Sequence, residues 1–227
     1  MTDRYRIAVL GGTGAEGGGL ALRWAHAGHE VTIGSRSTEK AVTAAEALNR
    51  LLPGHGNIRG AANGQAAQAA DVVVLAVPPD AQAATADAVR EHIEGKILID
   101  VTAPLVPPRV DIVQLPNGES VVYALQRRLG PGVKVVSAFQ NVSERHLRDL
   151  AHEIECDVLV CSDDARARET VIELARDIGL RAWHAGPLAN SAAVEALTSV
   201  LIAINKRYKV PASGIRITGV PDAGKKE

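Results

Sequence analysis

The sequence predicts an α/β fold, a doubly wound and mostly parallel sheet of about eight strands with a C-terminal helix. Short apolar runs alternate with amphipathic helical patterns along the chain. A glycine-rich turn follows the first run, and later runs are apolar on both faces, as in strands covered by helices on each side. No internal boundary is convincing, so we expect a single dinucleotide-binding domain over residues 1–209. Residues 210–227 are expected to form a short tail that frays.

The first predicted strand leads directly into a glycine turn. Tyr5–Leu10 is apolar, and Gly12, Gly14 and Gly17 then form the pattern G-x-G-x-x-G. A helical pattern and a second strand, Glu30–Ile33, follow, which is the context that a Rossmann-type dinucleotide site requires. The glycines permit a tight turn and let backbone N–H groups approach a pyrophosphate, which the partial positive charge of the helix N-terminus also favours. The predicted cofactor-binding turn is Gly12, Thr13, Gly14, Ala15 and Gly17.

The end of the second strand indicates which dinucleotide binds. An NAD site places a carboxylate there for the ribose 2′-hydroxyl, whereas this chain has Gly34-Ser35-Arg36, with Lys40 one turn later. Arg36 can offer a planar fork to a 2′-phosphate, Ser35 a hydroxyl and Lys40 a point charge. The alternative is that both cations are solvated residues at a helix start. Their position favours the first interpretation, so the predicted cofactor is NADP(H).

The rest of the chain continues the alternation. Ser37 is typical of a helix N-cap, and apolar residues then recur at helical spacing from Ala41 to Leu52. Further strands are expected at 57–61, 71–77, 96–100, 133–139, 157–161 and 181–184. Further helices are expected at 63–69, 81–92, 119–129, 144–151, 165–178 and 190–206. Residues 101–118 contain four prolines and form either a loop over the active site or a surface excursion.

Composition excludes several classes of partner. The formal net charge is −1 and basic residues form no long run, which argues against nucleic acid or an anionic membrane. The chain starts without a signal peptide, and no apolar run approaches the length of a membrane span, so a cytoplasmic location is expected. Cys156 and Cys161 bracket one extended strand and lie too far apart to pair. Histidines are scattered, so no metal site is predicted.

Sequence alone identifies no catalytic acid or base. His184 follows the last strand and is either a structural or a catalytic residue, and Glu195 is equally open. Asp163 and Asp164 begin a helix, where the helix dipole favours carboxylates. This lack of a clear proton donor indicates direct hydride transfer between two heterocyclic cofactors, which mainly requires two rings held in contact and water excluded. The sequence therefore assigns no catalytic residue.

Further motifs extend over nearly the whole chain and resemble one family. The matching segments are Gly11–Gly14 with Gly17, Leu20–Arg23, Gly28–Glu30, Gly34–Arg36 with Lys40, Val136–Ala138, Val160–Asp164, Ala185–Ser191, Val194-Glu195 and Leu197-Thr198. In these segments the chain resembles the NADPH-dependent coenzyme F420 reductases. The segment Ala185–Ser191 is the more specific match, because glycine turns are common to many NADP enzymes.

The resemblance implies a homodimeric, cytoplasmic enzyme that moves hydride between nicotinamide C4 and C5 of the deazaflavin ring. It implies that NADP(H) is the cofactor and coenzyme F420 the co-substrate. The residues that it assigns to the NADP phosphates are Thr13, Ser35, Arg36 and Lys40. Val77 and Pro78 would line the nicotinamide side, with the backbone of Ala138 near it.

The deazaflavin side departs from the family pattern. Gln140 stands where the family tends to have His, and Ala192 and Ala196 stand where it has Arg and Ser, whereas Thr198 is kept. These changes remove a charge and hydrogen-bond donors that could hold an acidic coenzyme tail. Two alternatives therefore stay open: a related reductase that uses a flavin, an imine or a quinone, and an NADP-binding sensor without turnover.

Overall fold

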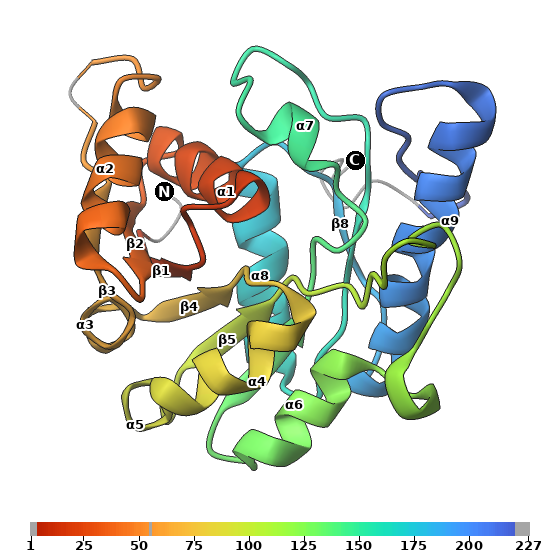
Figure 1. Ribbon diagram of the computed structural model, residues 1–227, viewed down its shortest axis with the longest axis horizontal. Helices are drawn as coiled ribbons and strands as arrows, with labels where there is room; N and C mark the ends of the chain where they lie inside the picture. Colours follow the sequence, from red (N-terminus) through yellow and green to blue (C-terminus); the bar gives the residue numbers. More distant parts are fainter. Residues whose placement is uncertain (1–3, 55, 221–227) are drawn as a thin grey trace.

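The computed structural model describes residues 4–54 and 56–220 (Figure 1). Six parallel strands form the main sheet in the order β3-β2-β1-β4-β5-β6. These strands are β1 (Arg6–Leu10), β2 (Glu30–Ser35), β3 (Arg59–Ala62), β4 (Val72–Leu75), β5 (Ile97–Asp100) and β6 (Lys134–Ser137). Since β1 leads to β2 on one side and pairs with β4 on the other, the strand order reverses between β1 and β4. Ligands of doubly wound sheets bind at such a reversal, outside the carboxyl ends of the strands.

Two further strands form a separate parallel pair, β7 (Val158–Val160) and β8 (Ala182–His184). The expected number of strands is confirmed, but not their union in one sheet. A single antiparallel bridge, between Ser137 and Cys161, joins β7 to the main sheet. The sequence could not reveal this because an apolar run does not specify which edge it pairs with.

Most helices lie close to the expected ranges, but the helix expected at 144–151 is a single turn, Glu144–Leu147. The helices are α1 (Ala15–His26), α2 (Thr38–Asn49), α3 (Asn63–Ala69), α4 (Pro79–Ala88), α5 (Arg90–Ile93), α6 (Val121–Leu129), α7 (Glu144–Leu147), α8 (Ala165–Asp177) and α9 (Ser191–Tyr208). Two short 3₁₀ turns, Pro116–Gly118 and Leu188–Asn190, precede α6 and α9. The helix expected at 81–92 is divided into α4 and α5, because Val89 leaves the helical conformation.

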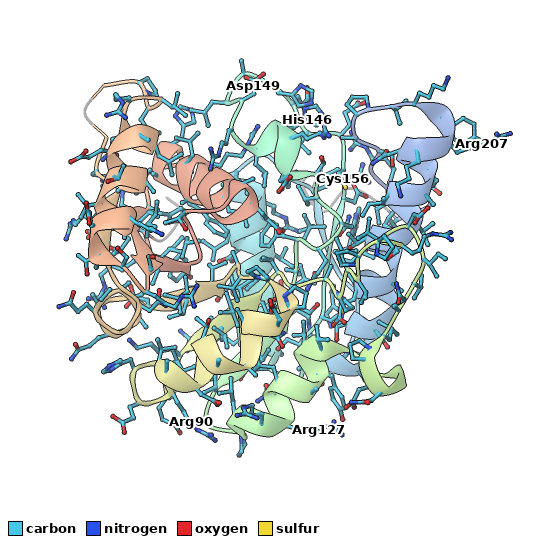
Figure 2. All side chains as sticks on the ribbon, viewed as in Figure 1. Arg90, Arg127, His146, Asp149, Cys156 and Arg207 are labelled. Carbon is cyan, nitrogen blue, oxygen red and sulfur yellow. The ribbon has the colours of Figure 1, made fainter. Side chains whose placement is uncertain are left out.

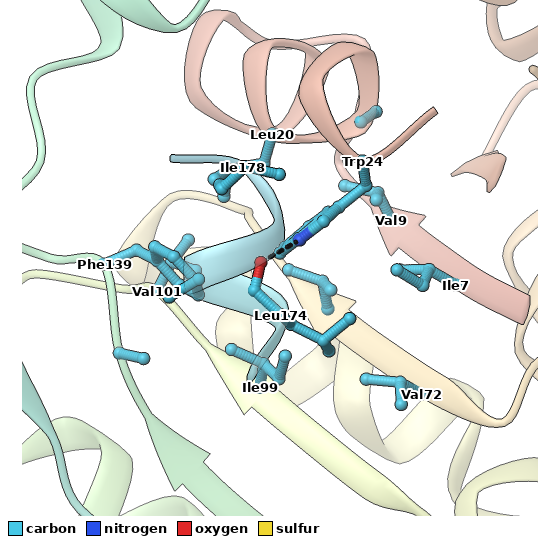
Figure 3. Packing of buried hydrophobic residues seen from close by; sticks show 14 of the residues in the cluster. Ile7, Val9, Leu20, Trp24, Val72, Ile99, Val101, Phe139, Leu174 and Ile178 are labelled. Atoms are coloured by element: carbon cyan, nitrogen blue, oxygen red, sulfur yellow. Dashed lines mark hydrogen bonds between the residues drawn. The ribbon is translucent and has the colours of Figure 1, made fainter. Parts of the chain in front are cut away.

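The strand pleat sends alternate side chains into two cores. Along β1, Ile7 and Val9 join the core beneath α1, α2 and α8, whereas Ala8 and Leu10 join the core beneath α3 to α6. The first core is centred on Trp24, whose indole Nε1 donates to the carbonyl of Leu174 at 3.0 Å (Figure 3). The ring of Phe139 meets the Trp24 ring edge-on at 5.7 Å. This contact anchors the start of the loop after β6, which carries part of the site.

Many charged side chains lie on the outer faces of the helices (Figure 2). Arg90 and Arg127 are exposed on α5 and α6, and Arg207 points away from the exposed end of α9. In Figure 1, α9 lies on the opposite side of the molecule from α2 and beside the loop that follows β5.

Helix α9 corrects one expectation from the sequence. Leu188–Tyr208 is a helical stretch of 21 residues that contains an 18-residue window with a mean hydropathy of 1.4, which is long and apolar enough for a membrane span by length and composition. The expectation that no apolar run approaches this length was therefore wrong. Helices that pack on a protein core pass the same test, and 33% of this window is buried in the structure. Its Glu195 carboxylate is also buried and bonded to Val121 N at 3.0 Å, which ties α9 to α6.

The C-terminal segment corrects another. The part of this segment around Ile215 and Ile217 is held beside the start of β7 and does not fray, since Asp157 N donates to Ile215 O at 2.8 Å and Ile217 N donates to the Asp157 carboxylate at 2.8 Å. A lone sequence pattern could not show this, because the partners are about sixty residues away. Residues 221–227 of the expected tail lie outside the described residues.

Candidate functional site

A cavity of about 700 Å³ opens at the carboxyl ends of β1, β4, β5 and β6. The glycine turn and the first turn of α1 form one wall, and the loop after β4 forms the next. Segments 101–105 and 140–145 continue the lining, while α9 and residues 210–213 close the remaining side. The proline-rich 101–118 stretch had two interpretations, a loop over the active site or a surface excursion. Its first residues line the cavity. Its later part runs along the surface.

The glycine turn lies so close to the chain after β4 that Gly11 and Gly17 have no room for side chains. Gly11 has φ +87°, and a Cβ there would overlap the carbonyl of Ala76. A Cβ at Gly17 would lie 2.9 Å from that of Ala76, so this glycine brings α1 against the end of β4. Gly14 is the N-cap of α1 and no side chain caps it, which leaves N–H groups of the first turn free for a ligand. Gly14, Ala15 and Gly17 line the cavity, whereas Gly12 is buried beneath it and Thr13 is exposed outside the lining.

The residues that are predicted to bind the 2′-phosphate lie beside this turn. Gly11 N donates to Gly34 O at 3.2 Å, which holds the end of β2 against the end of β1. Ser35 is half-buried there and accepts a hydrogen bond from Ser37 N at 3.2 Å. Arg36 and Lys40 are exposed and form no ion pair with the residues that the structure describes. Ser37 caps α2 through Lys40 N at 3.3 Å, which confirms its predicted role. The structure thus places two cations that have no ion pair among the described residues on the side of the glycine turn where β2 ends.

The other end of the cavity is lined mainly by uncharged residues. Val77 and Pro78, which the resemblance assigns to the nicotinamide side, lie in its wall. Ala138 is fully buried and is not part of the lining, because the chain reaches the cavity only two residues later, at Gln140. Thr198 also lines it, and its Oγ1 donates to Gln140 O at 2.8 Å.

Gln140 is fixed by its own hydrogen bonds. Its Nε2 donates to Asp100 O at 2.8 Å and to Ser137 Oγ at 2.9 Å, so the amide nitrogen faces the sheet. The two alanines that depart from the family pattern, Ala192 and Ala196, lie outside the cavity lining. Of the three departures, only Gln140 therefore lines the cavity, and the two alanines lie outside the lining.

Sequence reasoning missed Arg23, which holds a whole wall of the cavity. Its side chain is 8% exposed and donates to the carbonyls of four residues of the 143–152 segment, which carries α7. These acceptors are His146, Leu147, Asp149 and His152, at 2.7–3.0 Å. In Figure 2, His146 and Asp149 lie beside each other at α7, above the ribbon of α8. The signal was present in the sequence only as an arginine on the apolar side of α1.

The same segment explains the additional glycines of α1. A Cβ at Gly19 would overlap the side chain of Leu147, and a Cβ at Gly18 would lie 2.8 Å from the Arg148 guanidinium. Arg148 in turn donates to Gly14 O at 2.9 Å. The segment therefore rests directly on the α1 backbone, and its position is coupled to that of the glycine turn.

Two acids near the cavity have raised pKa values. Burial raises the pKa of Asp100 to about 6, although Thr102 and Gln82 donate hydrogen bonds to its carboxylate. Burial, together with the negative charges of Glu144 and Asp100, raises the pKa of Glu16 to about 8. Glu16 lines the cavity but Asp100 does not. Sequence reasoning passed over Glu16 because it lies at a variable position of the glycine motif.

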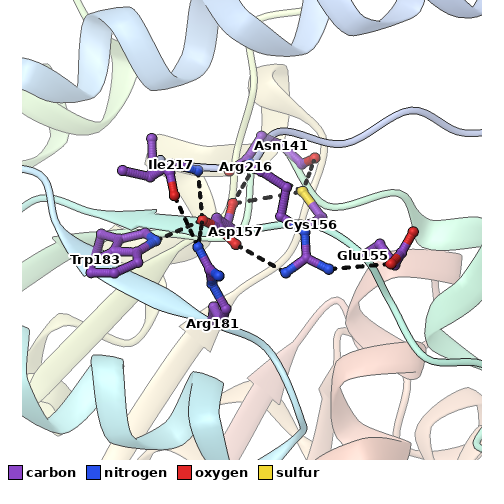
Figure 4. Close-up of polar contacts among 8 residues, drawn as sticks. All are labelled: Asn141, Glu155, Cys156, Asp157, Arg181, Trp183, Arg216 and Ile217. Carbon is purple, nitrogen blue, oxygen red and sulfur yellow. Dashed lines mark hydrogen bonds and ion pairs between the residues drawn. The ribbon is translucent and has the colours of Figure 1, made fainter. Parts of the chain in front are cut away.

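The last wall is held by a buried carboxylate, Asp157, which precedes β7 (Figure 4). It is fully buried and accepts hydrogen bonds from Ile217 N and from the side chains of Arg181 and Trp183, at 2.7–2.9 Å. Arg216 lies 3.7 Å from its other oxygen. Desolvation opposes its ionisation, but these hydrogen bonds outweigh it and hold its pKa below the usual range. Asp157 thereby fixes the C-terminal segment whose residues 210–213 line the cavity.

The other acid–base candidates have structural roles. His184 is exposed, lies outside the cavity lining, and accepts from Gly186 N at 3.1 Å. Asp164 caps α8 through Ala167 N at 2.7 Å, as the dipole argument predicts, and Asp163 accepts from Leu188 N at 2.9 Å. Glu195 bonds to the first turn of α6. Cys156 and Cys161 are both free and buried, in agreement with the expectation that they do not pair.

Comparison with known proteins adds a family-level observation. A family model described as "NADP oxidoreductase coenzyme F420-dependent" matches residues 6–104. The chain is 42% identical to an F420-dependent NADP reductase of Methanothermobacter marburgensis, over 96% of this chain and 100% of that protein. It is 40% identical to a protein of the same name from Methanocaldococcus jannaschii, over 95% of this chain and 99% of that protein.

A solved structure agrees with these relatives. It is from Arthrobacter sp. FB24 and is described as that of a proposed F420-dependent NADP reductase. The TM-score is 0.78 at 29% identity, with 94% of this chain and 99% of that chain covered. The similarity thus spans the sheet, the α7 segment and α9, and is not confined to the glycine turn.

Proposed function

The chain belongs to the family of coenzyme F420-dependent NADP oxidoreductases, and we propose that it transfers hydride between NADP(H) and coenzyme F420. The observation that carries the proposal is a cavity at the strand-order reversal that has the uncapped α1 terminus at one end and a largely uncharged recess at the other. A dinucleotide needs the first and two stacked heterocycles need the second. The relatives that bear this enzyme name align over nearly the full chain.

The residues present fit NADP(H). The open N-terminus at Gly14 and Ala15 offers N–H donors to a pyrophosphate, with Gly12, Thr13 and Gly17 shaping the turn. Arg36, Lys40 and Ser35 would hold the 2′-phosphate. The phosphate would give the two cations the negatively charged partner that they do not have among the described residues.

The recess would hold the reacting rings. Val77 and Pro78 lie on the nicotinamide side by their place after β4, and Ala138 supports the wall from behind without entering it. Thr198 and Gln140 would orient the second ring from the α9 side. When both cofactors are bound, the chemistry is transfer of a hydride from nicotinamide C4 to C5 of the deazaflavin. The protein contributes position and exclusion of water, for which it needs no acid or base in contact with the rings.

Rapid mixing of the protein with NADPH and oxidised deazaflavin tests the function. We expect the visible absorption of the deazaflavin to bleach with NADPH and much more slowly with NADH. Bleaching of only a flavin or a quinone, or consumption of NADPH by an imine, would replace the acceptor and keep the reductase. Tight NADPH binding without oxidation by any acceptor would instead make the protein a sensor.

We further propose that the protein is a homodimer. Val200, Ile204 and Tyr208 are exposed by 44%, 38% and 72% and follow one another at four-residue spacing along α9, so they form one apolar stripe. Val106, Ile112 and Val113 of the neighbouring loop are also exposed. A second copy of the chain would cover this surface, because helix faces of this kind are buried in stable proteins.

The molar mass measured by size-exclusion chromatography with light-scattering detection checks this prediction. The double variant Val200→Glu with Ile204→Glu should shift the protein from the dimer to the monomer mass, since each charge would have to be desolvated in the contact. Val42→Glu, on the exposed side of α2, is the matched control and should leave the mass unchanged. A wild-type monomer at every concentration would contradict the proposal.

The cytoplasm is the location that we propose. Two buried free thiols support it, because such thiols persist in a reducing compartment. We also propose that residues 1–209 fold as one domain, with the segment from Val210 as an extension. Limited proteolysis that cut within 1–209 before the extension would contradict this division.

A further inference from the structure

Glu16 is an acidic side chain in the wall of the cofactor cavity. It is the second residue of α1 and lines the cavity together with Ala15 and Gly17, directly beside the open helix terminus. It is half-buried, and the described residues offer it neither a hydrogen bond nor an ion pair. A carboxyl group in the wall of a site for a polyanionic dinucleotide needs a physical account.

The charged groups around Glu16 leave it without a counterion. From α7, Glu144 and Arg145 line the same cavity, and Arg148 is engaged with Gly14 O. From β5, Asp100 lies buried behind the wall, and its charge and that of Glu144 both act on Glu16. From α9, Lys206 reaches the cavity but pairs with Asp111 at 3.3 Å. Burial, together with the charges of Glu144 and Asp100, raises the pKa of Glu16 to about 8.

These neighbours also locate Glu16 along the cofactor. Arg36 and Lys40 follow β2, on the outer side of the glycine turn, where the adenosine phosphate would lie. Asp100 is the last residue of β5, and Glu144 is the first residue of α7, which comes after β6. Both therefore lie on the other side of the glycine turn, toward the recess. Glu16 lines the cavity together with Glu144, whereas Arg36 and Lys40 lie outside the lining, so Glu16 belongs to the part of the site that faces the recess, the nicotinamide half in the proposed function.

We propose that Glu16 senses the charge of the nicotinamide ring: its ionised form disfavours NADPH relative to NADP⁺, so that NADPH binds together with a proton. This inference rests on the proposed function of the cavity. The diphosphate repels an ionised Glu16 in both complexes. The oxidised ring, which carries a positive charge, attracts that carboxylate, whereas the reduced ring is neutral and does not.

Proton uptake on binding is the direct test. Calorimetric titration at pH 8 in buffers of different ionisation enthalpy gives the number of protons taken up per nucleotide. For NADPH we expect about half a proton, because Glu16 is then half ionised in the free protein and neutral in the complex. For NADP⁺ the uptake should be clearly smaller. From pH 6.5 to pH 9 the ratio of the NADPH to the NADP⁺ dissociation constant should rise about three- to tenfold.

Three variants control the experiment. Glu16→Gln and Glu16→Leu should both remove the difference in proton uptake and flatten the ratio against pH, and circular dichroism confirms that each is folded. Glu46→Gln, on the exposed face of α2 outside the cavity, should behave as wild type. Glu144→Gln should move the midpoint of the uptake to lower pH, because it removes one of the charges that act on Glu16.

The possible failures are distinguishable. If neither nucleotide binds, the proposed function of the cavity is wrong. If both bind and Glu16→Gln shows the same uptake as wild type, the cavity keeps its function and the role of Glu16 is overturned. Equal uptake for NADPH and NADP⁺ in wild type would likewise overturn it.

Discussion

Arg23 shows how a single residue sets one wall of the site. Its guanidinium satisfies four backbone carbonyls of one turn, which no aliphatic side chain could do. These carbonyls would otherwise be left unpaired beneath α7, at a cost of about 1–3 kcal/mol each where buried. The segment that carries Glu144 and Arg145 therefore takes its place from a side chain on the cofactor helix.

Gly19 provides a prediction about the same contact. Gly19→Ala should lower stability by about 1–3 kcal/mol and weaken NADPH binding, because the new methyl group would push the Leu147 segment off α1. Denaturant unfolding and nucleotide titration measure the two effects. Gly64→Ala, in α3, is the matched control, since its methyl group would meet only ordinary contacts at 3.4 Å from His92. If both substitutions behaved alike, the close approach at Gly19 would not matter.

Arg36 provides a prediction about cofactor choice. Arg36→Glu should weaken NADPH by about 1–3 kcal/mol more than NADH, on the scale of charge-assisted hydrogen bonds. Fluorescence titration of both nucleotides gives the difference. Arg50→Glu, at the far end of α2, should change neither. Equal losses for NADPH and NADH in the Arg36 variant would show that this residue does not recognise the 2′-phosphate.

At the scale of elements, a short C-terminal segment acts as a wall because β7 and β8 hold it. Asp157 receives donors from the segment and from β8, so one carboxylate joins three parts of the chain (Figure 4). Gly214 fits the same place, since a Cβ there would lie 2.8 Å from that of Cys156. A segment that looks like a tail in the sequence is thereby made part of the cavity.

Asp157→Asn tests this arrangement. It should lower stability by about 3 kcal/mol, the scale of a broken buried ion pair, and should release the segment. Hydrogen exchange at Ile217 N reports the release directly. The control is Glu155→Gln, which removes the 80% exposed partner of Arg216 and should cost little. Full protection of the Ile217 amide in the Asp157 variant would contradict the assignment.

At the scale of the whole molecule, buried acids set the dependence of stability on pH. Burial raises the pKa of Glu195 to about 7 despite its bonds to Ser120, Val121 and Val122, and raises those of Glu16 and Asp100 to about 8 and about 6. The folded state thus holds protons that the unfolded chain has already lost. Stability should fall as pH rises from about 4.5 to 8. Asp157 has a lowered pKa, so its contribution is lost only in acid.

Thermal unfolding across this range measures the slope. Wild type should have a lower melting temperature at pH 8 than at pH 5, and Glu195→Gln should show a shallower decline between pH 5 and pH 7. The slope is compared and not the absolute stability, because the amide changes the hydrogen bonds as well. A parallel decline in the variant would show that Glu195 does not carry the effect.

The sequence by itself determined the alternation of strands and helices, the glycine turn, the cap at Ser37 and the place of Arg36 after the second strand. These features are local: periodicity, φ freedom and spacing are properties of a few neighbouring residues. The helix expected at 63–69 shows how far such signals reach, since α3 spans Asn63–Ala69. They also indicated which end of the sheet would carry the site.

Only the tertiary structure decided that β7 and β8 leave the main sheet, that Arg23 and Asp157 hold two walls of the cavity, and that Glu16 faces it without a counterion. Each of these depends on partners roughly sixty or more residues away, or on which of several apolar runs lie side by side. A residue's chemistry is written in the sequence, but its burial and its partners arise only when distant segments pack together. For this reason the cofactor turn could be predicted, and the walls around it could not.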